Sequence, residues 1–319
     1  MQIRPGLKRL AVLASIGMIF LILGGALVTK TDSGDGCGTS FPLCKGKLIP
    51  DEVTTETIIE ASHRLTTLIV LLIVIFFSYR AWKELGHLRD TRRLIILGIF
   101  FFIVQSLVGA ARVMWGHADF ILALHFGISL ISFGAVFMLT LWIFELDRKW
   151  NTEKLILSRT YQIHTIAIIC FSFIVIYSGA YVQHTNASMI CPDWPFCRND
   201  AIGLPHNYYE WVQMAHRLLA GLLFVWILSM FVYVSRHYKR NRVIYYSWFI
   251  NVILISLQVL SGALVIKSGL NLYISLLHAF FITCLFGSLS YLVFMIYRYR
   301  KEKKKVSIPT LPATAKENW

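Results

Sequence analysis

Residues 243–266 have the sequence VIYYSWFINVILISLQVLSGALVI and contain no Asp, Glu, Lys or Arg. A helix needs about 20 apolar residues to cross the hydrocarbon core of a bilayer, so this run is long enough to do so. Residues 270–297 form a second run without any of these charged residues. Neither run alternates in the two-residue period of a membrane β-strand. Both therefore predict transmembrane α-helices.

The rest of the 319-residue chain has the same character. Apolar residues make up 56% of it and charged residues 15%, and its mean hydropathy is positive, whereas a soluble domain of this length carries more charge. Six further apolar segments lie at 8–28, 59–82, 94–112, 119–144, 160–182 and 211–235. The sequence therefore predicts an all-α integral membrane protein with eight transmembrane helices. The first of them lacks a small-residue cleavage site, which predicts an uncleaved anchor.

The net charge of +14 is distributed unevenly between the two sides of the predicted membrane protein. Basic residues gather before the first predicted helix and after the second, fourth, sixth and eighth. These loops share one side, and basic loops mark the cytoplasm. We therefore expect a multi-pass protein of the plasma membrane with both termini cytoplasmic. The basic tail is expected to contact anionic lipid, and nucleic acid is not an expected partner because no folded domain stands behind the charge.

The sequence repeats itself with an offset of 153 residues. The matched positions are His63 and His216, Gln105 and Gln258, Gly109 and Gly262, and His125 and His278, with Gly25 and Gly179 matching at an offset of 154. Each half holds four predicted helices in the same orientation, which predicts two tandem four-helix bundles related by a parallel internal repeat. The expected boundaries are 1–145 for the first bundle, 146–158 for a cytoplasmic linker, 159–297 for the second bundle and 298–319 for the basic tail.

Four of the ten histidines lie inside predicted helices at matched depth. They are His63, His125, His216 and His278. Each lies about six residues into an even-numbered helix, which is about 9 Å below the outer surface at about 1.5 Å per residue. Equal depth lets the two imidazoles of one bundle face a common ligand from opposite sides. An isolated membrane histidine is more often a hydrogen-bonding core residue, but two repeated pairs favour ligation.

Neutral imidazole binds zinc, copper and haem iron. Zinc and copper sites usually gather three or four ligands, whereas two axial histidines across a four-helix bundle suit haem. Glycines such as Gly109 and Gly262 permit close approach either of a flat ligand or of a neighbouring helix. Arg64 and Arg217 follow their histidines directly. Their guanidinium groups either pair with haem propionates or extend to lipid headgroups.

The two halves differ one helical turn before the first histidine of each pair. Glu60 lies three residues before His63, on roughly the same helix face, and Gln213 takes its place in the second half. A carboxylate inside a membrane helix costs free energy and is a candidate functional group, although a glutamate near a helix start also favours the helix dipole. Acting as a general base or stabilising positive charge requires the carboxylate. This difference predicts one reactive half and one holding half.

Two pairs of cysteines fall in the longest outer loops, on the oxidising side of the membrane. They are Cys37 with Cys44 and Cys191 with Cys197. Disulfides are expected there. Two disulfides that order the loops above the bundles are the first interpretation, and a redox role for the first pair is the alternative.

Together these segments resemble the haem A synthase family, in its bacterial form with a cysteine pair in each half. The matching runs are GGALVTKT at 24–31, GCG at 36–38, PLC at 42–44, EASHR at 60–64, ALHFGIS at 123–129, GAYV at 179–182, WVQMAHR at 211–217 and LH at 277–278. They cover nearly the whole chain up to about residue 305.

The resemblance implies an oxidoreductase that oxidises the C8 methyl of haem O to a formyl group by successive hydroxylations, giving haem A for terminal oxidases. It implies that His63 and His125 bind the substrate haem, with Glu60 as the catalytic carboxylate. It also implies that His216 and His278 ligate a resident haem b, and that a Cys37–Cys44 disulfide lies beside the substrate site. A membrane electron acceptor is an expected partner, and a haem O synthase is a further candidate.

Two other classes of function fit part of the pattern. A di-haem b cytochrome that exchanges electrons with quinones explains the histidine pairs but leaves Glu60 without a role. A transporter explains a parallel repeat. However, no predicted helix is broken by proline, and the histidines are expected near the outer edge and not at the midplane.

Overall fold

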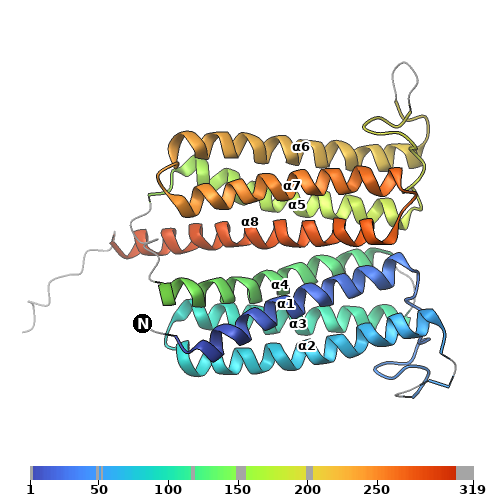
Figure 1. The fold of residues 1–319 in the computed structure, drawn as a ribbon, viewed down its shortest axis with the longest axis horizontal. Helices are drawn as coiled ribbons and strands as arrows, with labels where there is room; N and C mark the ends of the chain where they lie inside the picture. The colour runs from blue at the N-terminus through green and yellow to red at the C-terminus, as the bar shows by residue number, and fades with distance from the viewer. Residues whose placement is uncertain are drawn as a thin grey trace, which may run out of the picture.

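The computed structural model describes residues 3–47, 50–51, 53–115, 119–148, 156–198 and 204–306. This part of the chain contains eight α-helices long and apolar enough to cross a membrane (Figure 1). They are α1 (Pro5–Lys30), α2 (Thr55–Leu85), α3 (Arg89–Trp115), α4 (Asp119–Arg148), α5 (Arg159–His184), α6 (Tyr208–His237), α7 (Arg242–Lys267) and α8 (Leu272–Val306). The predicted fold class, an all-α multi-pass membrane protein with eight transmembrane helices, is confirmed.

Short polar residues begin several of the helices. The side chains of Thr54, Ser158, Asn207 and Asn241 each accept a hydrogen bond from the backbone N–H three residues later, at the starts of α2, α5, α6 and α7. Such a cap satisfies a backbone donor that the helix start leaves free and contributes about 1 kcal/mol. Helix α1 instead begins with Pro5, whose missing N–H costs nothing in the first turn.

The helices form two groups, α1–α4 and α5–α8, that lie side by side (Figure 1). In the first group α1 contacts α2 and α4, and α3 packs on α4; in the second, α5 contacts α6 and α8, and α7 packs on α8. The groups meet mainly through α4 and α8, which run next to each other through the centre of the molecule, with α1 and α5 beside them.

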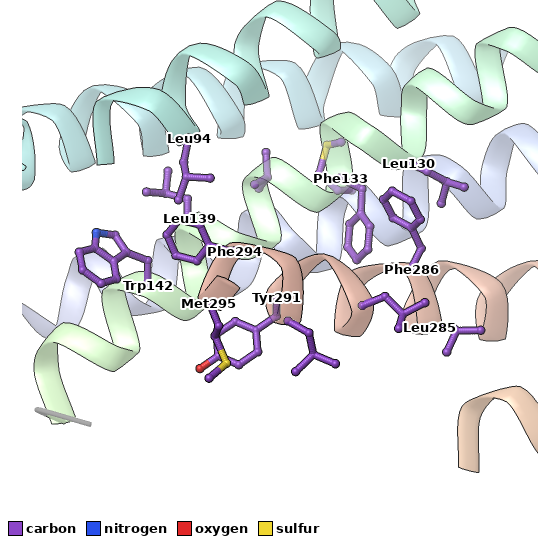
Figure 2. Close-up of a cluster of buried hydrophobic side chains, with 14 of the residues drawn as sticks. Leu94, Leu130, Phe133, Leu139, Trp142, Leu285, Phe286, Tyr291, Phe294 and Met295 are labelled. Atoms are coloured by element: carbon purple, nitrogen blue, oxygen red, sulfur yellow. The ribbon is translucent and has the colours of Figure 1, made fainter. Parts of the chain in front are cut away.

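Aromatic side chains fill the contact between α4 and α8 (Figure 2). The ring of Phe286 lies 3.2 Å from the place that a Cβ on Gly134 would take, and the ring of Phe133 lies 3.0 Å from the corresponding place at Gly287. Phe133 and Phe286 lie 153 residues apart, as do Gly134 and Gly287. In each half, a glycine therefore packs against the phenylalanine of the other half, and the two contacts involve positions that the sequence repeat matches.

A partly buried ion pair joins the same two helices at the end opposite the disulfide loops. The Arg298 guanidinium donates to Glu145 Oε1 at 2.5 Å, and the two side chains are 17% and 3% exposed. The guanidinium also lies 4.3 Å from the ring centroid of Trp142. Glu145 and Arg298 are again 153 residues apart. The contact between the halves thus pairs equivalent positions at its polar end as well as in its apolar centre.

Helix α8 continues past the predicted boundary between the second bundle and the basic tail. It runs to Val306, so residues 298–306 are helical. Arg300 donates from Nε to the Gln162 side chain at 2.7 Å, and Lys301 contacts Asp90 at 2.7 Å. The first basic residues of the expected tail therefore bind other helices. Residues 307–319, and residues 149–155 of the expected linker, lie outside the described part of the chain.

Candidate functional site

Two disulfide loops lie at one end of the helices, between α1 and α2 and between α5 and α6. Cys37 is bonded to Cys44 in the first loop, and Cys191 to Cys197 in the second. Both predicted disulfides are present.

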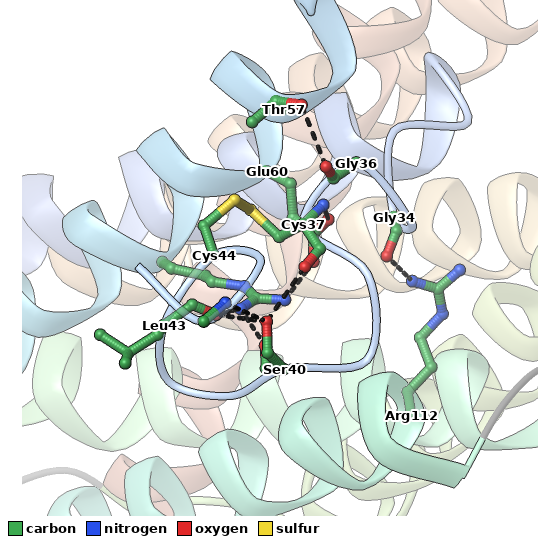
Figure 3. Close-up of polar contacts among 11 residues, drawn as sticks. Gly34, Gly36, Cys37, Ser40, Leu43, Cys44, Thr57, Glu60 and Arg112 are labelled. Carbon is green, nitrogen blue, oxygen red and sulfur yellow. Dashed lines mark hydrogen bonds and ion pairs between the residues drawn. A yellow bond between two sulfur atoms is a disulfide. The ribbon is translucent and has the colours of Figure 1, made fainter. Parts of the chain in front are cut away.

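Glu60 holds the first disulfide loop (Figure 3). This carboxylate is buried, at 3% exposure, and its Oε2 accepts a hydrogen bond from the backbone N–H of Cys37 at 2.7 Å. Its Oε1 accepts a second from Arg64 at 2.6 Å. Arg64 also donates to the backbone carbonyls of Ser40 and Leu43, at 2.7 Å each. Both carboxylate oxygens are therefore engaged, and the loop is tied to the first turns of α2.

Gln213 holds the second loop in the same way without a charge. Its Oε1 accepts from the backbone N–H of Cys191 at 2.7 Å, and its amide donates to the carbonyl of Ser188 at 2.8 Å. Arg217 donates to the carbonyls of Cys191 and Phe196, at 3.0 and 2.9 Å. Both arginines thus donate to loop carbonyls, contacts that neither sequence-based interpretation, propionate pairing or extension to headgroups, includes. Arg217 also lines the cavity described next, and both interpretations stay predictions.

A cavity of about 510 Å³ lies at this end of the helices and reaches both halves. All four predicted histidines line it: His63 of α2, His125 of α4, His216 of α6 and His278 of α8. The structure therefore brings the two predicted pairs into one continuous space. Glu60 is not among the lining residues, because its carboxylate points to the disulfide loop, one helical turn outward from His63.

Hydrogen bonds identify the free nitrogen of His216. Its Nδ1 lies 2.8 Å from Ser178 Oγ, and that hydroxyl donates its hydrogen to the carbonyl of Val175 at 2.7 Å. Because a serine hydroxyl has a single hydrogen, His216 must be the donor in the first contact. Its proton is therefore on Nδ1, and Nε2 carries the lone pair that a metal would bind.

His278 is held in the same manner. Its Nδ1 lies 2.9 Å from Ser261 Oγ, which donates to the backbone carbonyl of Gln258 at 3.0 Å. The side-chain amide nitrogen of Gln258 lies 3.0 Å from His278 Nε2. An amide nitrogen can only donate, so this contact also assigns the lone pair of His278 to Nε2.

The histidines of the first half are held differently. His125 Nδ1 lies 2.8 Å from the backbone carbonyl of Gln105, which can only accept, so Nε2 again carries the lone pair. The Nδ1 of His63 is buried and has no hydrogen-bond partner in the described part of the chain, and the same holds for the side-chain nitrogen of Gln105.

Glycines on the neighbouring helices leave room for the imidazole rings. A Cβ on Gly24 would lie 3.0 Å from His63, and one on Gly109 would lie 3.1 Å from Cε1 of His125. The corresponding distances are 2.9 Å at Gly179, against His216, and 3.1 Å at Gly262, against His278. In the structure these glycines therefore permit close packing of the imidazole rings, a contact that the sequence did not distinguish from helix packing.

The donor set fits haem better than a bare metal ion. No group of three or more His, Cys, Asp or Glu side chains that could hold a metal ion occurs among the described residues. Haem brings four equatorial nitrogens of its own and needs protein ligands only at the axial positions. Two imidazoles per half, three of them with an assigned Nε2 lone pair, can supply those positions.

Comparison with known proteins agrees with this chemistry. A family model described as "Cytochrome oxidase assembly protein" (COX15-CtaA) matches residues 8–290. The chain is 50% identical over 295 residues to the "Heme A synthase" of Geobacillus thermodenitrificans, which covers 92% of this chain and 93% of the relative. It is 48% identical to that of Lysinibacillus sphaericus, covering 95% and 99%, and 51% identical to that of Macrococcus caseolyticus, covering 92% and 97%.

The chain belongs to the haem A synthase family. The synthase name of these relatives supports haem A biosynthesis over the di-haem cytochrome and the transporter. In this member of the haem A synthase family, all four histidines that the sequence singled out line one cavity.

Two serines that hold the second-half histidines, Ser178 and Ser261, are not among the residues predicted from the sequence. Ser178 and Ser261 directly precede Gly179 and Gly262, which match glycines of the first half. The repeat offsets place Gly24 opposite Ser178 and Val108 opposite Ser261. A search for polar positions that the repeat does not match would have detected both serines.

Proposed function

We propose that this chain is a haem A synthase, an oxidoreductase that converts haem O to haem A by oxidising a methyl group to a formyl group. One observation carries the proposal: two histidine pairs at repeated positions line a single cavity in a chain about half identical to proteins of that name. The specific methyl, at C8, and the course through successive hydroxylations follow from the resemblance to the family.

The first bundle, residues 1–145, is the proposed substrate half. His63 and His125 bind haem O from opposite sides, through α2 and α4. The contact of His125 Nδ1 with the carbonyl of Gln105 supports this role, since it leaves Nε2 as the coordinating atom. The mainly small and apolar wall of the cavity, which includes Gly25 and Ala26, favours a flat apolar macrocycle over a hydrated substrate.

Glu60 is the proposed catalytic carboxylate of that half. Oxidation of a methyl group releases protons and develops positive charge at the reacting carbon, and a fixed carboxylate can accept the one or stabilise the other. Gln213 supports this role by comparison. It binds the equivalent backbone N–H at the same distance of 2.7 Å, so this hydrogen bond does not require a charge. The charge of Glu60 is paired with Arg64, and its proposed further task is in the reaction.

The second bundle, residues 159–297, is the proposed site of a resident haem b held by His216 and His278. Haem b, when bound, supplies one-electron transfer toward a membrane electron acceptor. The chain supplies two imidazoles whose Nδ1 atoms are bound to Ser178 and Ser261. The shared cavity makes the two proposed haem sites neighbours.

The orientation in the membrane is also a proposal. The disulfide loops lie at one end of the bundle and belong on the oxidising, outer side of the plasma membrane. Lys301 and Arg298 lie at the other end, which is expected to be cytoplasmic together with both termini. The expected contacts of the basic tail with anionic lipid, and of the chain with a haem O synthase, remain predictions.

Pigment extraction from the purified protein tests this function. A synthase made in cells that supply haem O should contain haem b together with haem O or haem A. The Glu60→Gln variant should contain haem b and haem O without haem A. Haem b as the only pigment of the unmodified protein would favour the di-haem cytochrome, and a colourless protein would favour the transporter.

A further inference from the structure

The two proposed haem sites differ in the hydrogen bonds behind their histidines. In the second half, both Nδ1 atoms donate to a serine hydroxyl that is itself bonded to a backbone carbonyl. In the first half, His125 donates directly to the carbonyl of Gln105, and the Nδ1 of His63 is a buried atom without a partner in the described part of the chain. We call a histidine anchored when its Nδ1 donates to a protein acceptor. Both histidines of the second half are anchored, whereas in the first half only His125 is.

The repeat shows that the difference comes from two side chains. The carbonyl of Gln105 corresponds to that of Gln258, at the offset of 153 residues. His125 reaches its carbonyl directly, whereas the hydroxyl of Ser261 stands between His278 and the equivalent carbonyl. At the other ligand, Ser178 corresponds to Gly24, and a glycine offers no hydroxyl to His63.

A hydrogen bond from the second ring nitrogen has two known consequences for a histidine ligand. It fixes the tautomer and the orientation of the ring, and it makes the coordinating nitrogen more basic. Loss of such a partner typically weakens metal binding by about 10–100-fold. A ligand that lacks the partner rotates more freely and releases iron more readily.

Serines in membrane helices often bond only to a carbonyl of their own helix. Ser178 and Ser261 do make such bonds, but each hydroxyl oxygen also accepts from an imidazole of a neighbouring helix. Because the same arrangement occurs at both ligands of the second half, local helix bonding does not account for it.

We propose that Ser178 and Ser261 are positioning residues that retain haem in the second half, and that Gly24 leaves His63 as a displaceable ligand through which haem enters and leaves the first half. This inference rests on the proposed function, in which one half keeps its haem and the other exchanges substrate for product. It names the side chains that create that difference, independently of Glu60.

The retention arm of the test measures haem release from the full-length protein. Protein loaded with haem b alone is mixed with excess apomyoglobin, and haem transfer is followed by absorbance. Ser178→Ala should release the second-half haem at least about tenfold faster than the unmodified protein, and Ser178→Thr, which keeps the hydroxyl, should restore slow release. The midpoint potential of this haem should rise in Ser178→Ala, because a less basic imidazole stabilises the oxidised iron less.

The second part of the test measures haem exchange in the first half, and it adds a hydroxyl where the first part removed one. Gly24→Ser adds a hydroxyl beside His63, and Gly24→Ala is the matched control that adds the same Cβ, 3.0 Å from Nδ1, without the hydroxyl. Gly24→Ser protein from cells that supply haem O should retain more haem O or haem A through purification and release it to apomyoglobin more slowly than Gly24→Ala protein. Equal release from these two variants would overturn the role of Gly24.

His216→Ala separates failure of this inference from failure of the proposed function. If His216→Ala loses its haem b while Ser178→Ala matches the unmodified protein in release rate and midpoint potential, the serine proposal is wrong and the site stands. If His216→Ala keeps haem b in full, the haem site itself is wrongly assigned. Fast release in Ser178→Ala with rescue in Ser178→Thr supports the proposal.

Discussion

The two disulfide loops are held by the same hydrogen bond from different residues. Glu60 in the first half and Gln213 in the second each accept the backbone N–H of the first cysteine at 2.7 Å. An arginine one turn later ties each loop further through its carbonyls. This hydrogen bond is therefore made without a charge in the second half, although the second contact differs, since Glu60 pairs with Arg64 and Gln213 donates to Ser188. The comparison therefore separates what Glu60 does for the fold from what remains for chemistry.

The histidines show a second difference between the halves. The anchored pair, His216 and His278, lies in the half with the neutral Gln213, and the partly anchored pair lies in the half with the charged Glu60. Both differences have the direction expected if one half reacts and exchanges its haem while the other retains it. The side chains that create them, Glu60 and Gln213 for the charge and Gly24, Ser178 and Ser261 for the anchoring, lie on different helices, so each difference can be tested alone.

Removal of one histidine from each half should have the largest and most unequal effects. His216→Ala removes a proposed ligand of haem b, so bound haem b should fall at least about tenfold, given what even outer contacts of a ligand contribute. His63→Ala should keep haem b and lose haem A formation. Pyridine haemochrome spectra quantify haem b, and chromatography of extracted pigments separates haem O from haem A. Equal loss of haem b in both variants would contradict the assignment of halves.

Exchanging Glu60 and Gln213, the residues that hold the disulfide loops, should affect turnover and not haem content. Glu60→Gln keeps an acceptor for the N–H of Cys37, as Gln213 does for Cys191, but removes the charge. We expect haem A formation to fall about 10²–10⁴-fold, the range of general acid–base contributions, while haem b is retained. Gln213→Glu adds a carboxylate beside Arg217 in the other half and should leave turnover within a few-fold of its original value.

Product formation per bound haem O, measured over time, checks this pair of variants. A thermal melt confirms that both remain folded. Full activity of Glu60→Gln would end the catalytic assignment. An equal loss of turnover in Gln213→Glu would show that turnover depends on the hydrogen bonds that hold the disulfide loops and not on the Glu60 carboxylate.

Loss of a disulfide should destabilise the two halves alike but inactivate them unequally. Each bond closes a short loop, with sequence separations of 7 and 6 residues, for which the chain-entropy argument gives about 2–3 kcal/mol. Cys191→Ser should therefore lower thermal stability and cost less activity than removal of Glu60. Cys37→Ser should cost more activity than Cys191→Ser, because the N–H of Cys37 holds Glu60. Thermal unfolding and haem A formation are the measurements, and equal inactivation would give both loops the same role.

The features predicted correctly from sequence are those that depend on local pattern. Apolar runs longer than about 20 residues have few alternatives to a transmembrane helix, and all eight helices are present. His63 and His125 line the same cavity as His216 and His278, because similar spacing from the helix starts gives similar depth.

The features that were missed depend on partners distant in sequence. Arg64 has a long side chain that can reach several groups, and only the fold of its loop shows that the carbonyl of Ser40 is one of them. Ser178 meets His216 only because α5 packs against α6. Lys301 remains helical in a chain segment expected to be a tail, and its partner Asp90 lies 211 residues away.

The smallest effect should come from the contact between the halves, and it tests whether that contact is reciprocal. When residue i of one unit contacts j of another and the reverse also holds, the units meet as in a two-fold interface. Gly134→Ala would place a Cβ 3.2 Å from Phe286, and Gly287→Ala one 3.0 Å from Phe133. Overpacking costs about 1–3 kcal/mol, and the better helix propensity of alanine returns nearly 1 kcal/mol, so each variant should lose about 1 kcal/mol.

Double-mutant cycles on thermal stability can detect the pairing within this small effect. Gly134→Ala combined with Phe286→Leu should show a favourable coupling energy, because the smaller side chain makes room for the new methyl. Gly134→Ala with Phe133→Leu should show a smaller one, because the new methyl does not face Phe133. The converse should hold for Gly287→Ala, which faces Phe133. Couplings that follow the opposite pairing, or none at all, would mean that the halves do not meet through equivalent positions.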